Sequence, residues 1–307
     1  MKTKLPISNC RLPIIRQSAE IFSGSIENRK SKIEDAFTLV EVMVVVVLLS
    51  LIVLALMAVF NTTQQAFRAS ITQTDVLEGG RAAMDLMAED LRELSPSLQN
   101  NAVNFYAANA SAYPLVQSFL TGGQRTNVME NFFILKRNNQ TWSGVGYAVY
   151  VTPTNLYSLY RFSMSTNVAA SSPLALYNIF TNDVYSGAWT NLSHLMDGVV
   201  QLTVRAYDNQ GIWMTNGYPS PTNATVANVQ FYPPAFGEIG FCMTNNALPA
   251  SAEIEMGVLE DRTLRRAESL SGNVTAQSNY LAGAAAQVHL FRQRVAVPNV
   301  DPSVYSQ

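Results

Sequence analysis

An apolar run from Val42 to Phe60 constrains this chain more than any other feature. Within the run only Ser50 is polar, and the length is close to the ~20 residues that a helix needs to cross a bilayer. The apolar core of a secretory signal peptide is usually shorter and is followed by a small-residue cleavage site, whereas this run continues into helix-forming sequence. The run therefore predicts a single membrane-spanning helix.

The residues that precede this run are polar and mostly basic. The basic residues Lys2, Lys4, Arg11, Arg16, Arg29, Lys30 and Lys32 outnumber the acidic residues Glu20, Glu27, Glu34 and Asp35. By the positive-inside rule, residues 1–35 are expected in the cytoplasm and the C-terminal part of the chain across the membrane.

Length, charge and cysteine usage narrow the possible classes of protein. Of the 307 residues, about 210 follow Leu94, enough for one globular domain with a sizeable core. The formal net charge is −2 and no long basic cluster lies in the C-terminal part, so we expect no nucleic-acid partner. If the N-terminal segment with Cys10 is removed, Cys242 remains alone and no intramolecular disulfide can form.

The sequence after Phe60 becomes polar but contains no proline until Pro96. Apolar residues recur there at helical spacing, with one row of Phe60, Phe67, Leu77, Met84 and Leu91 and a second row of Met87 and Leu94. This pattern predicts one helix from Phe37 to Leu94, spanning the membrane over 37–60 and lying against a folded domain over 61–94. Gly79-Gly80 is its weak point. Close packing or a local kink is favoured there over a stretch that melts when subunits assemble.

Beyond Pro96 the apolar residues alternate with a period of two. The alternating segments are 130–139, 144–165 (two strands joined around Pro153-Thr154-Asn155), 198–214, 250–259 and 285–297. Alternation of this kind predicts an antiparallel sheet with one buried face. Residues 100–128, 165–193 and 214–235 are expected to be long loops. The prediction is an α+β fold in which the long N-terminal helix packs on an antiparallel β-sheet domain over 95–307.

The start of the apolar helix resembles a known processing signal. Residues 36–41 read Ala-Phe-Thr-Leu-Val-Glu, and this string before an apolar helix resembles the signal of type IV pilins and type II secretion pseudopilins. In those families a small residue, nearly always glycine, precedes Phe-Thr-Leu-x-Glu, and here Ala36 takes that place. The resemblance implies that prepilin peptidase removes residues 1–36, a long leader, and methylates the new amino group of Phe37.

The same resemblance gives a role to Glu41, which lies five residues into the mature chain. In a helical filament its buried carboxylate can pair with the N-terminal ammonium of a neighbouring subunit. Such pairing offsets the cost of burial and fixes the axial register, which is the best-attested use of a buried polar group. Glu41 is therefore the predicted assembly residue, and Ala36 and Phe37 are the predicted processing residues.

A narrower resemblance concerns residues 80–94, Gly-Arg-Ala-Ala-Met-Asp-Leu-Met-Ala-Glu-Asp-Leu-Arg-Glu-Leu. This segment is similar to the second half of the first helix in J-type minor pseudopilins and W-type minor pilins. It implies a structural subunit of a type II secretion pseudopilus, helping to initiate or form the filament tip. Its implied partners are prepilin peptidase, other major and minor pseudopilins or pilins, the inner-membrane assembly platform and membrane lipid. The alternatives are a minor pilin of a surface pilus used for adhesion, motility or DNA uptake, and a membrane-anchored binding domain that is never processed.

We expect no enzymatic activity, cofactor or metal, because the sequence contains no nucleophile–base arrangement, phosphate loop or paired carboxylate motif. The two histidines, His194 and His289, have no cysteine, histidine or acidic residue at metal-ligand spacing. Residues 208–211, Asp-Asn-Gln-Gly, lack the EF-hand pattern, so a hairpin turn is favoured over a calcium loop.

Two further groups of residues have both a structural and a functional interpretation. For the charged group Asp261, Arg262, Arg265 and Arg266, a solvated face is favoured over an inter-subunit contact. For the tyrosines Tyr147, Tyr150, Tyr157 and Tyr160, sheet packing is favoured over contact with a carbohydrate or substrate.

Overall fold

The computed structural model describes residues 38–110, 115–119, 121–152, 156–169, 172–187, 189, 191–215 and 228–301. The predicted leader 1–36, with the cleavage residues Ala36 and Phe37, lies outside these residues, as does the predicted turn at 153–155. The chain divides into two compact units, residues 1–60 and residues 61–307.

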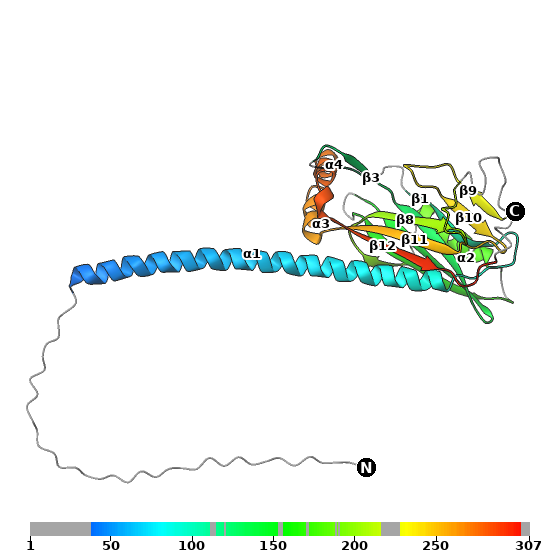
Figure 1. Cartoon of the computed structure of the whole chain (residues 1–307), viewed down its shortest axis with the longest axis horizontal. Helices are drawn as coiled ribbons and strands as arrows, with labels where there is room; N and C mark the ends of the chain where they lie inside the picture. The colour runs from blue at the N-terminus through cyan, green and yellow to red at the C-terminus, as the bar shows by residue number, and fades with distance from the viewer. Residues whose placement is uncertain are drawn as a thin grey trace, which may run out of the picture. The chain divides into compact units, whose positions relative to one another are not determined.

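The first described element is helix α1 (Leu39–Arg92), which begins directly after Thr38 (Figure 1). Its 54 residues contain no proline, so the intrahelical hydrogen bonds continue without a break, also through Gly79 and Gly80. The continuous helix predicted from the sequence is thereby confirmed over the described residues.

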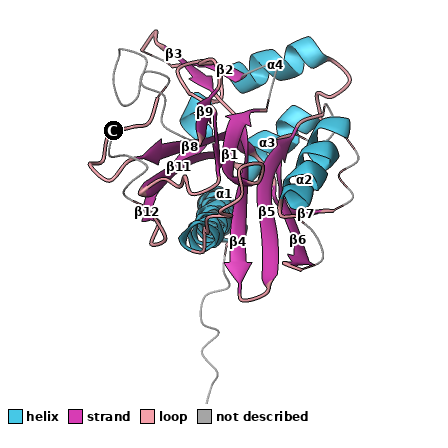
Figure 2. Cartoon of the chain, turned by 90° about the vertical axis from the view of Figure 1, so that its right-hand side faces the viewer, coloured by secondary structure: helices cyan, strands magenta, loops and turns pink. Residues whose placement is uncertain are grey.

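Antiparallel strands build most of the second unit, which confirms the predicted α+β class. The larger sheet has seven strands in the order β7-β6-β5-β4-β1-β10-β9. Its strands are β1 (Val103–Asn109), β4 (Glu130–Asn138), β5 (Thr141–Tyr150), β6 (Ser158–Asn167), β7 (Leu192–Met196), β9 (Val229–Phe231) and β10 (Phe241–Thr244). Figure 2 shows the long strands β4, β5 and β6 side by side, and each pairs with its neighbour in antiparallel register.

A smaller sheet has three strands in the order β12-β11-β8. Its strands are β8 (Val199–Tyr207), β11 (Ser251–Leu259) and β12 (Val288–Ala296), and a separate hairpin consists of β2 (Leu115–Ser118) and β3 (Gln124–Asn127). The remaining elements are α2 (Leu174–Ser186), α3 (Asp261–Glu268), α4 (Val274–Ala282) and the 3-10 turn η1 (Ala285–Gln287).

The two sheets meet where β4 begins. The backbone N–H of Leu202 donates to the carbonyl oxygen of Val128 (2.9 Å), and the N–H of Val204 donates to the side-chain carboxyl of Glu130 (2.7 Å). Burial raises the pKa of Glu130 to about 8; repulsion by Glu238 adds to the rise, while the hydrogen bond from Val204 opposes it. The junction therefore depends on a carboxyl group that keeps its proton at neutral pH.

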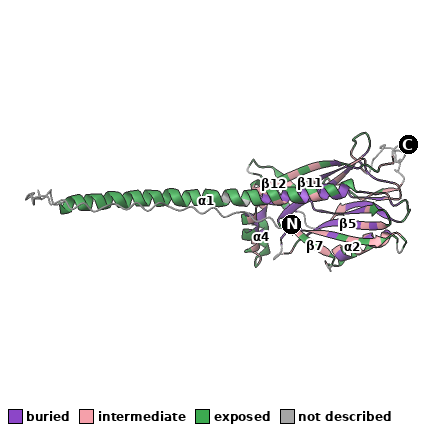
Figure 3. Cartoon of the chain, turned by 90° about the horizontal axis from the view of Figure 1, so that it is seen from below, coloured by how far each residue is buried: buried purple, intermediate pink, exposed green. Residues whose placement is uncertain are grey.

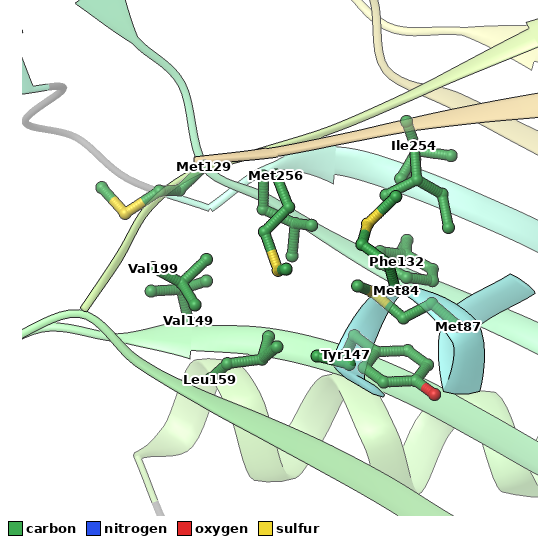
Figure 4. Packing of buried hydrophobic residues seen from close by; sticks show 14 of the residues in the cluster. Met84, Met87, Met129, Phe132, Tyr147, Val149, Leu159, Val199, Ile254 and Met256 are labelled. Carbon is green, nitrogen blue, oxygen red and sulfur yellow. The ribbon is translucent and has the colours of Figure 1, made fainter. Parts of the chain in front are cut away.

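The C-terminal part of α1 packs into a core shared by both sheets. The buried residues of this part of the helix are Val76, Ala83, Met84, Met87, Ala88 and Leu91, and Leu94 follows them directly after the helix. Figure 4 shows Met84 and Met87 gathered with Phe132 and Tyr147 of the larger sheet and Ile254 of the smaller sheet. The amphipathic second half predicted from the sequence therefore does lie on the domain, over part of its length.

The packing of α1 begins later than its apolar rows suggest. Phe67, predicted to belong to the packed stripe, is 66 % exposed, and Phe60 is exposed as well. In Figure 3 the ribbon of α1 is green for exposed residues along its first part, and purple buried positions occur only in its second part. Helical periodicity identifies an apolar face, but only the position of the sheets decides where that face is covered.

Gly80 allows the helix to approach β12 closely. A Cβ atom built at Gly80 would lie 2.4 Å from the ring of Phe291, whereas one at Gly79 would meet nothing nearer than the Cε of Met196, at 3.9 Å. The favoured interpretation of the glycine pair, close packing against the domain, holds for Gly80.

The larger sheet is buried on both faces, so the prediction of a single buried face is wrong for it. One face contributes Phe132 and Tyr147 to the core with α1, and the other contributes Phe133, which lies 5.6 Å from the ring of Phe180 in α2. Gly146 leaves room for α2, since a Cβ there would lie 2.4 Å from the Phe180 ring. Cover on both faces requires apolar residues at nearly every strand position, which obscures the alternation.

Two of the three expected loops contain regular structure in their interior, and the third has a short strand near its end. Residues 100–128 contain β1, β2 and β3, residues 165–193 contain α2, and residues 214–235 contain β9. Strand β1 is buried on both faces and therefore does not alternate. The buried residues of helix α2 are Leu176, Phe180 and the polar Asp183, and its other apolar residues are not confined to that face, so its helical period is weak in the sequence.

Candidate functional site

Thr38 and Glu41 form a reciprocal hydrogen-bonded cap at the start of α1. The backbone N–H and the hydroxyl of Thr38 both donate to Oε2 of Glu41 at 2.9 Å, and the backbone N–H of Glu41 donates to the Thr38 hydroxyl at 3.3 Å. This is the capping box of the Thr-x-x-Glu spacing, in which two helix-terminal donors are satisfied reciprocally. Glu41 therefore has a local role within its own chain that the resemblance to pilins did not reveal.

The predicted processing residues, Ala36 and Phe37, lie outside the described residues. Cleavage between them, methylation of Phe37 and the assembly role of Glu41 therefore stay predictions. The Thr-x-x-Glu spacing before an apolar run is itself a sequence signal for a helix start, and it would have located the capping box.

Among the described residues, none covers the helix segment that follows the cap. Every residue from Leu39 to Phe60 is exposed, although nearly all of them are apolar. Among the described residues, α1 is the one helix long and apolar enough to cross a membrane. An apolar surface that runs around the whole helix requires lipid or other apolar helices as its surroundings.

A charged cluster fixes the C-terminal end of α1 to the larger sheet. Asp90 is only 2 % exposed and receives hydrogen bonds from Lys136, Tyr147 and Arg161. Both Nε and Nη2 of Arg161 lie 3.0 Å from a carboxylate oxygen of Asp90, which gives the fork-like geometry that strengthens such pairs. We call Asp90, Lys136, Tyr147 and Arg161 the anchor cluster.

The anchor cluster keeps Asp90 ionised inside the protein. Burial alone raises the pKa of Asp90, but the hydrogen bonds from Arg161, Lys136 and Tyr147 outweigh it and hold the pKa below its ordinary value. The sequence offered a signal for this cluster, since Asp90 lies three residues after Met87 and four before Leu94, on the apolar face of the helix. A carboxylate on that face requires buried partners.

Each of the two histidines lies beside one carboxylate. Nε2 of His194 lies 2.7 Å from Asp197, and Nε2 of His289 lies 3.3 Å from Glu260. Within the described ranges, no group of three or more histidine, cysteine, aspartate or glutamate side chains is placed to hold a metal ion.

The predicted hairpin turn at residues 208–211 is present. The Asp208 carboxylate accepts hydrogen bonds from the backbone N–H groups of Gln210 (2.9 Å) and Ile212 (2.7 Å), and Gly211 adopts a φ of +82°. These bonds stabilise the turn that follows β8, as aspartate commonly does in turns.

The charged residues at 261–266 belong to α3. Asp261 and Arg265 form an ion pair of 2.9 Å one helical turn apart, and Arg262 is exposed. Arg266 lies over the ring of Tyr280 at 5.6 Å. This arrangement agrees with the favoured interpretation of a solvated face, and whether another subunit contacts it stays open.

The four tyrosines singled out in the sequence separate into two pairs. Tyr147 and Tyr157 are buried, and Tyr147 donates to Asp90, which agrees with a role in sheet packing. Tyr150 and Tyr160 are only half-buried, and both rings contact Trp189, with centroids 4.6 and 5.1 Å away. The structure thus distinguishes a packing pair from an aromatic group near the surface.

Comparison with known proteins identifies the N-terminal motif. Residues 32–57 match the family model of the prokaryotic N-terminal methylation motif, which includes Ala36, Phe37 and Glu41. No match was found among curated proteins or among solved structures. The motif and the apolar helix together indicate a membrane-anchored protein that carries a prokaryotic N-terminal methylation motif.

Proposed function

We propose that the protein is a minor pseudopilin, a structural subunit of a type II secretion pseudopilus that helps to initiate or form the filament tip. The observation that carries this proposal is the methylation motif over residues 32–57, which leads directly into the uncovered apolar helix from Leu39 to Phe60. An α+β domain at the end of such a helix is the architecture expected of a pilin-like subunit.

The uncovered helix supports assembly as well as anchoring. In the inner membrane, lipid surrounds the segment from Leu39 to Phe60, and the C-terminal domain lies in the periplasm. In a filament, the same segments of neighbouring subunits replace the lipid. Both environments are apolar, so transfer between them keeps the side chains out of water.

Register in the filament would come from Glu41. Once prepilin peptidase has cleaved after Ala36, the amino group of Phe37 is available as a cation, and the Glu41 carboxylate of an adjacent subunit can pair with it. Within one chain, Glu41 already accepts hydrogen bonds from Thr38. The assembly platform therefore has to bring together a carboxylate and an ammonium that belong to different copies.

Mass spectrometry of the mature N-terminus tests the proposal most directly. We expect a chain that begins with N-methylated Phe37. A chain that retains Met1 in its native membrane would overturn the filament proposal and favour a membrane-anchored binding domain that is never processed.

The variant Glu41→Gln separates the two roles of this residue. Glutamine also serves in a capping box, so the bonds with Thr38 persist while the charge is lost. We expect normal processing and membrane insertion but strongly reduced incorporation into filaments, measured by shearing and immunoblotting. The matched control Thr38→Ala removes the cap and keeps the charge, so it should assemble. Normal incorporation of Glu41→Gln would contradict the pairing mechanism.

A minor pilin of a surface type IV pilus is the second candidate. The segment from Gly80 to Leu94 favours it equally, since it resembles W-type minor pilins as well as J-type minor pseudopilins. Deletion of the gene distinguishes the two functions. Loss of protein export with intact surface pili supports the pseudopilin, and loss of surface pili with intact export supports the pilin.

A further inference from the structure

A pocket of about 630 Å³ lies between α1 and the start of α3. Its volume lies in the range of small-molecule sites. The residues that line it are all polar or charged: Gln65, Arg68, Gln73, Glu260, Asp261, Arg262 and Arg265. A lining of this kind offers hydrogen bonds and charges to a ligand rather than apolar contact.

The pocket continues the packed face of α1 towards the N-terminus. Gln73, Arg68 and Gln65 precede Val76 by three, eight and eleven residues, which places all of them on the same side of the helix. From Val76 onward this side is apolar at the buried positions and packs on the sheets. Before Val76 it is polar where α3 stands opposite, so the space between the two helices stays open to polar ligands.

Helix α3 is fixed in place beside this pocket. Its residues Thr263, Leu264 and Ala267 are buried. Nε2 of Gln277 in α4 donates a hydrogen bond to the carbonyl oxygen of Ala267 at 2.9 Å. The charged residues on the other side of α3 therefore project from a backbone that packing and α4 already hold in position.

The start of α3 brings both signs of charge into the pocket. Arg265 pairs with Asp261 at 2.9 Å, and the Glu260 carboxylate lies 3.3 Å from Nε2 of His289. Arg262 is exposed, and within the described part of the chain it forms no ion pair. A ligand that is only anionic would meet the two carboxylates as like charges, whereas a ligand with an anion and a cation a few bonds apart complements the whole lining.

The pocket lies close to the level of the lipid headgroups. The apolar run ends at Phe60, and Gln65 and Arg68 follow it by five and eight residues in the same helix. At a rise of 1.5 Å per residue, these two residues lie roughly 8 and 12 Å beyond the run. The headgroup layer extends roughly 5–8 Å beyond the hydrocarbon, and long charged side chains reach back towards it. A headgroup can therefore enter the pocket from its membrane side.

We propose that this pocket binds the headgroup of phosphatidylethanolamine, in which a phosphate is joined to a primary amine. The phosphate accepts hydrogen bonds from Arg262 and Arg265, and the ammonium donates to Glu260 or Asp261. A choline headgroup has no N–H to donate, and a glycerol headgroup lacks the cation. The proposal needs the membrane anchor but neither processing nor filament assembly, so its failure would leave the proposed function untouched.

Zero-length crosslinking of the full chain tests the proposal. A carbodiimide joins a carboxylate to a primary amine that touches it, so phosphatidylethanolamine can be coupled and phosphatidylcholine cannot. The full chain is placed in nanodiscs of both lipids, and peptide mass spectrometry locates the lipid adducts. We expect an adduct on Glu260 or Asp261 with a yield at least about threefold above that on Asp75, an exposed carboxylate of α1 outside this pocket.

Two variants assign the adduct to headgroup binding. Arg262→Gln removes a guanidinium that holds the phosphate and keeps both carboxylates, so the yield on Glu260 and Asp261 should fall at least about threefold. Arg92→Gln alters an exposed arginine at the other end of α1 and should leave the yield unchanged. Both positions are exposed, so neither variant should unfold the domain.

Several outcomes would overturn the proposal. These are the absence of an adduct on Glu260 and Asp261, a yield there no higher than on Asp75, and a yield that Arg262→Gln leaves unchanged. Loss of the adduct on addition of excess inorganic phosphate would overturn it as well, because the pocket would then prefer a free anion to a lipid headgroup.

Discussion

The two ends of α1 belong to one uninterrupted helix but have opposite relations to the rest of the chain. From Leu39 to Phe60 the helix is apolar all round and every residue is exposed. From Val76 to Arg92 one face is buried and the opposite face is polar. The comparison shows that the hydrophobicity of a helix segment does not by itself reveal what that segment packs against. An apolar stripe packs on a folded domain, whereas a helix that is apolar all round needs apolar surroundings, which the described residues do not supply.

The largest effect is expected at the anchor cluster, which has no counterpart in the first part of the helix. Asp90→Ala leaves Arg161 without its counter-charge beside a buried site and leaves Lys136 with Glu93 alone, so it should reduce the free energy of unfolding by about 3–5 kcal/mol. Urea unfolding followed by tryptophan emission measures this. Glu93→Ala is the matched control. Glu93 also pairs with Lys136 but is 58 % exposed, so its loss should cost no more than about 1 kcal/mol. Equal effects of the two variants would contradict the anchoring role.

The second prediction compares leucines from the two parts of the helix. Leu91 is fully buried, so Leu91→Ala should cost about 2–5 kcal/mol of the free energy of unfolding. Leu49 is 60 % exposed, and Leu49→Ala should leave the urea midpoint of the C-terminal domain unchanged. A shift of that midpoint by Leu49→Ala would show that the first part of the helix contributes to the fold of the domain.

The third prediction concerns the pH dependence of stability, which we expect to arise in the C-terminal domain. The only ionisable residue from Leu39 to Phe60 is Glu41, whereas Glu130 lies buried in the domain with its pKa raised to about 8. The folded state thus holds this proton up to about pH 8, while the unfolded chain releases it near pH 4.5. The contribution of Glu130 to the free energy of unfolding is fully present below pH 4.5. It is lost as the pH rises towards 8, by at most about 1.4 kcal/mol per pH unit.

The variant Glu130→Gln checks this assignment. Its amide oxygen can still accept from the N–H of Val204, but the group no longer titrates. The free energy of unfolding, measured by urea titration from pH 5 to 8, should fall less steeply with pH in the variant than in the wild type. An unchanged slope would place the pH response at another group.

The smallest effects distinguish the two adjacent glycines. Gly80→Ala drives a methyl group into the ring of Phe291, and the overpacking of about 1–3 kcal/mol should exceed the gain in helix propensity of about 1 kcal/mol. Gly79→Ala makes only an ordinary van der Waals contact with Met196, at 3.9 Å, so the thermal midpoint should rise. Opposite signs of the two shifts in melting temperature confirm that only Gly80 is a contact position, and equal signs would refute it.

Local sequence predicted the elements whose pattern depends on a single environment. The apolar run from Val42 to Phe60, the strands with clear alternation and the motif around Glu41 could all be read directly, because each repeats one chemical property at one period. Strand β1 and helix α2 were missed, since burial on two faces hides alternation in β1, and apolar residues spread around α2 hide its helical period.

By itself, the sequence determined that α1 is one long helix with an apolar first part, and that an antiparallel sheet domain follows it. Only the tertiary structure decided that the packed stripe starts at Val76 rather than at Phe60, that Gly80 lies against Phe291, and that Asp90 meets Lys136, Tyr147 and Arg161. The physical reason is the distance along the chain between the residues that interact. Helical and strand periods arise from residues close in the chain, whereas burial and the partners of Asp90 depend on segments that lie far apart in the sequence.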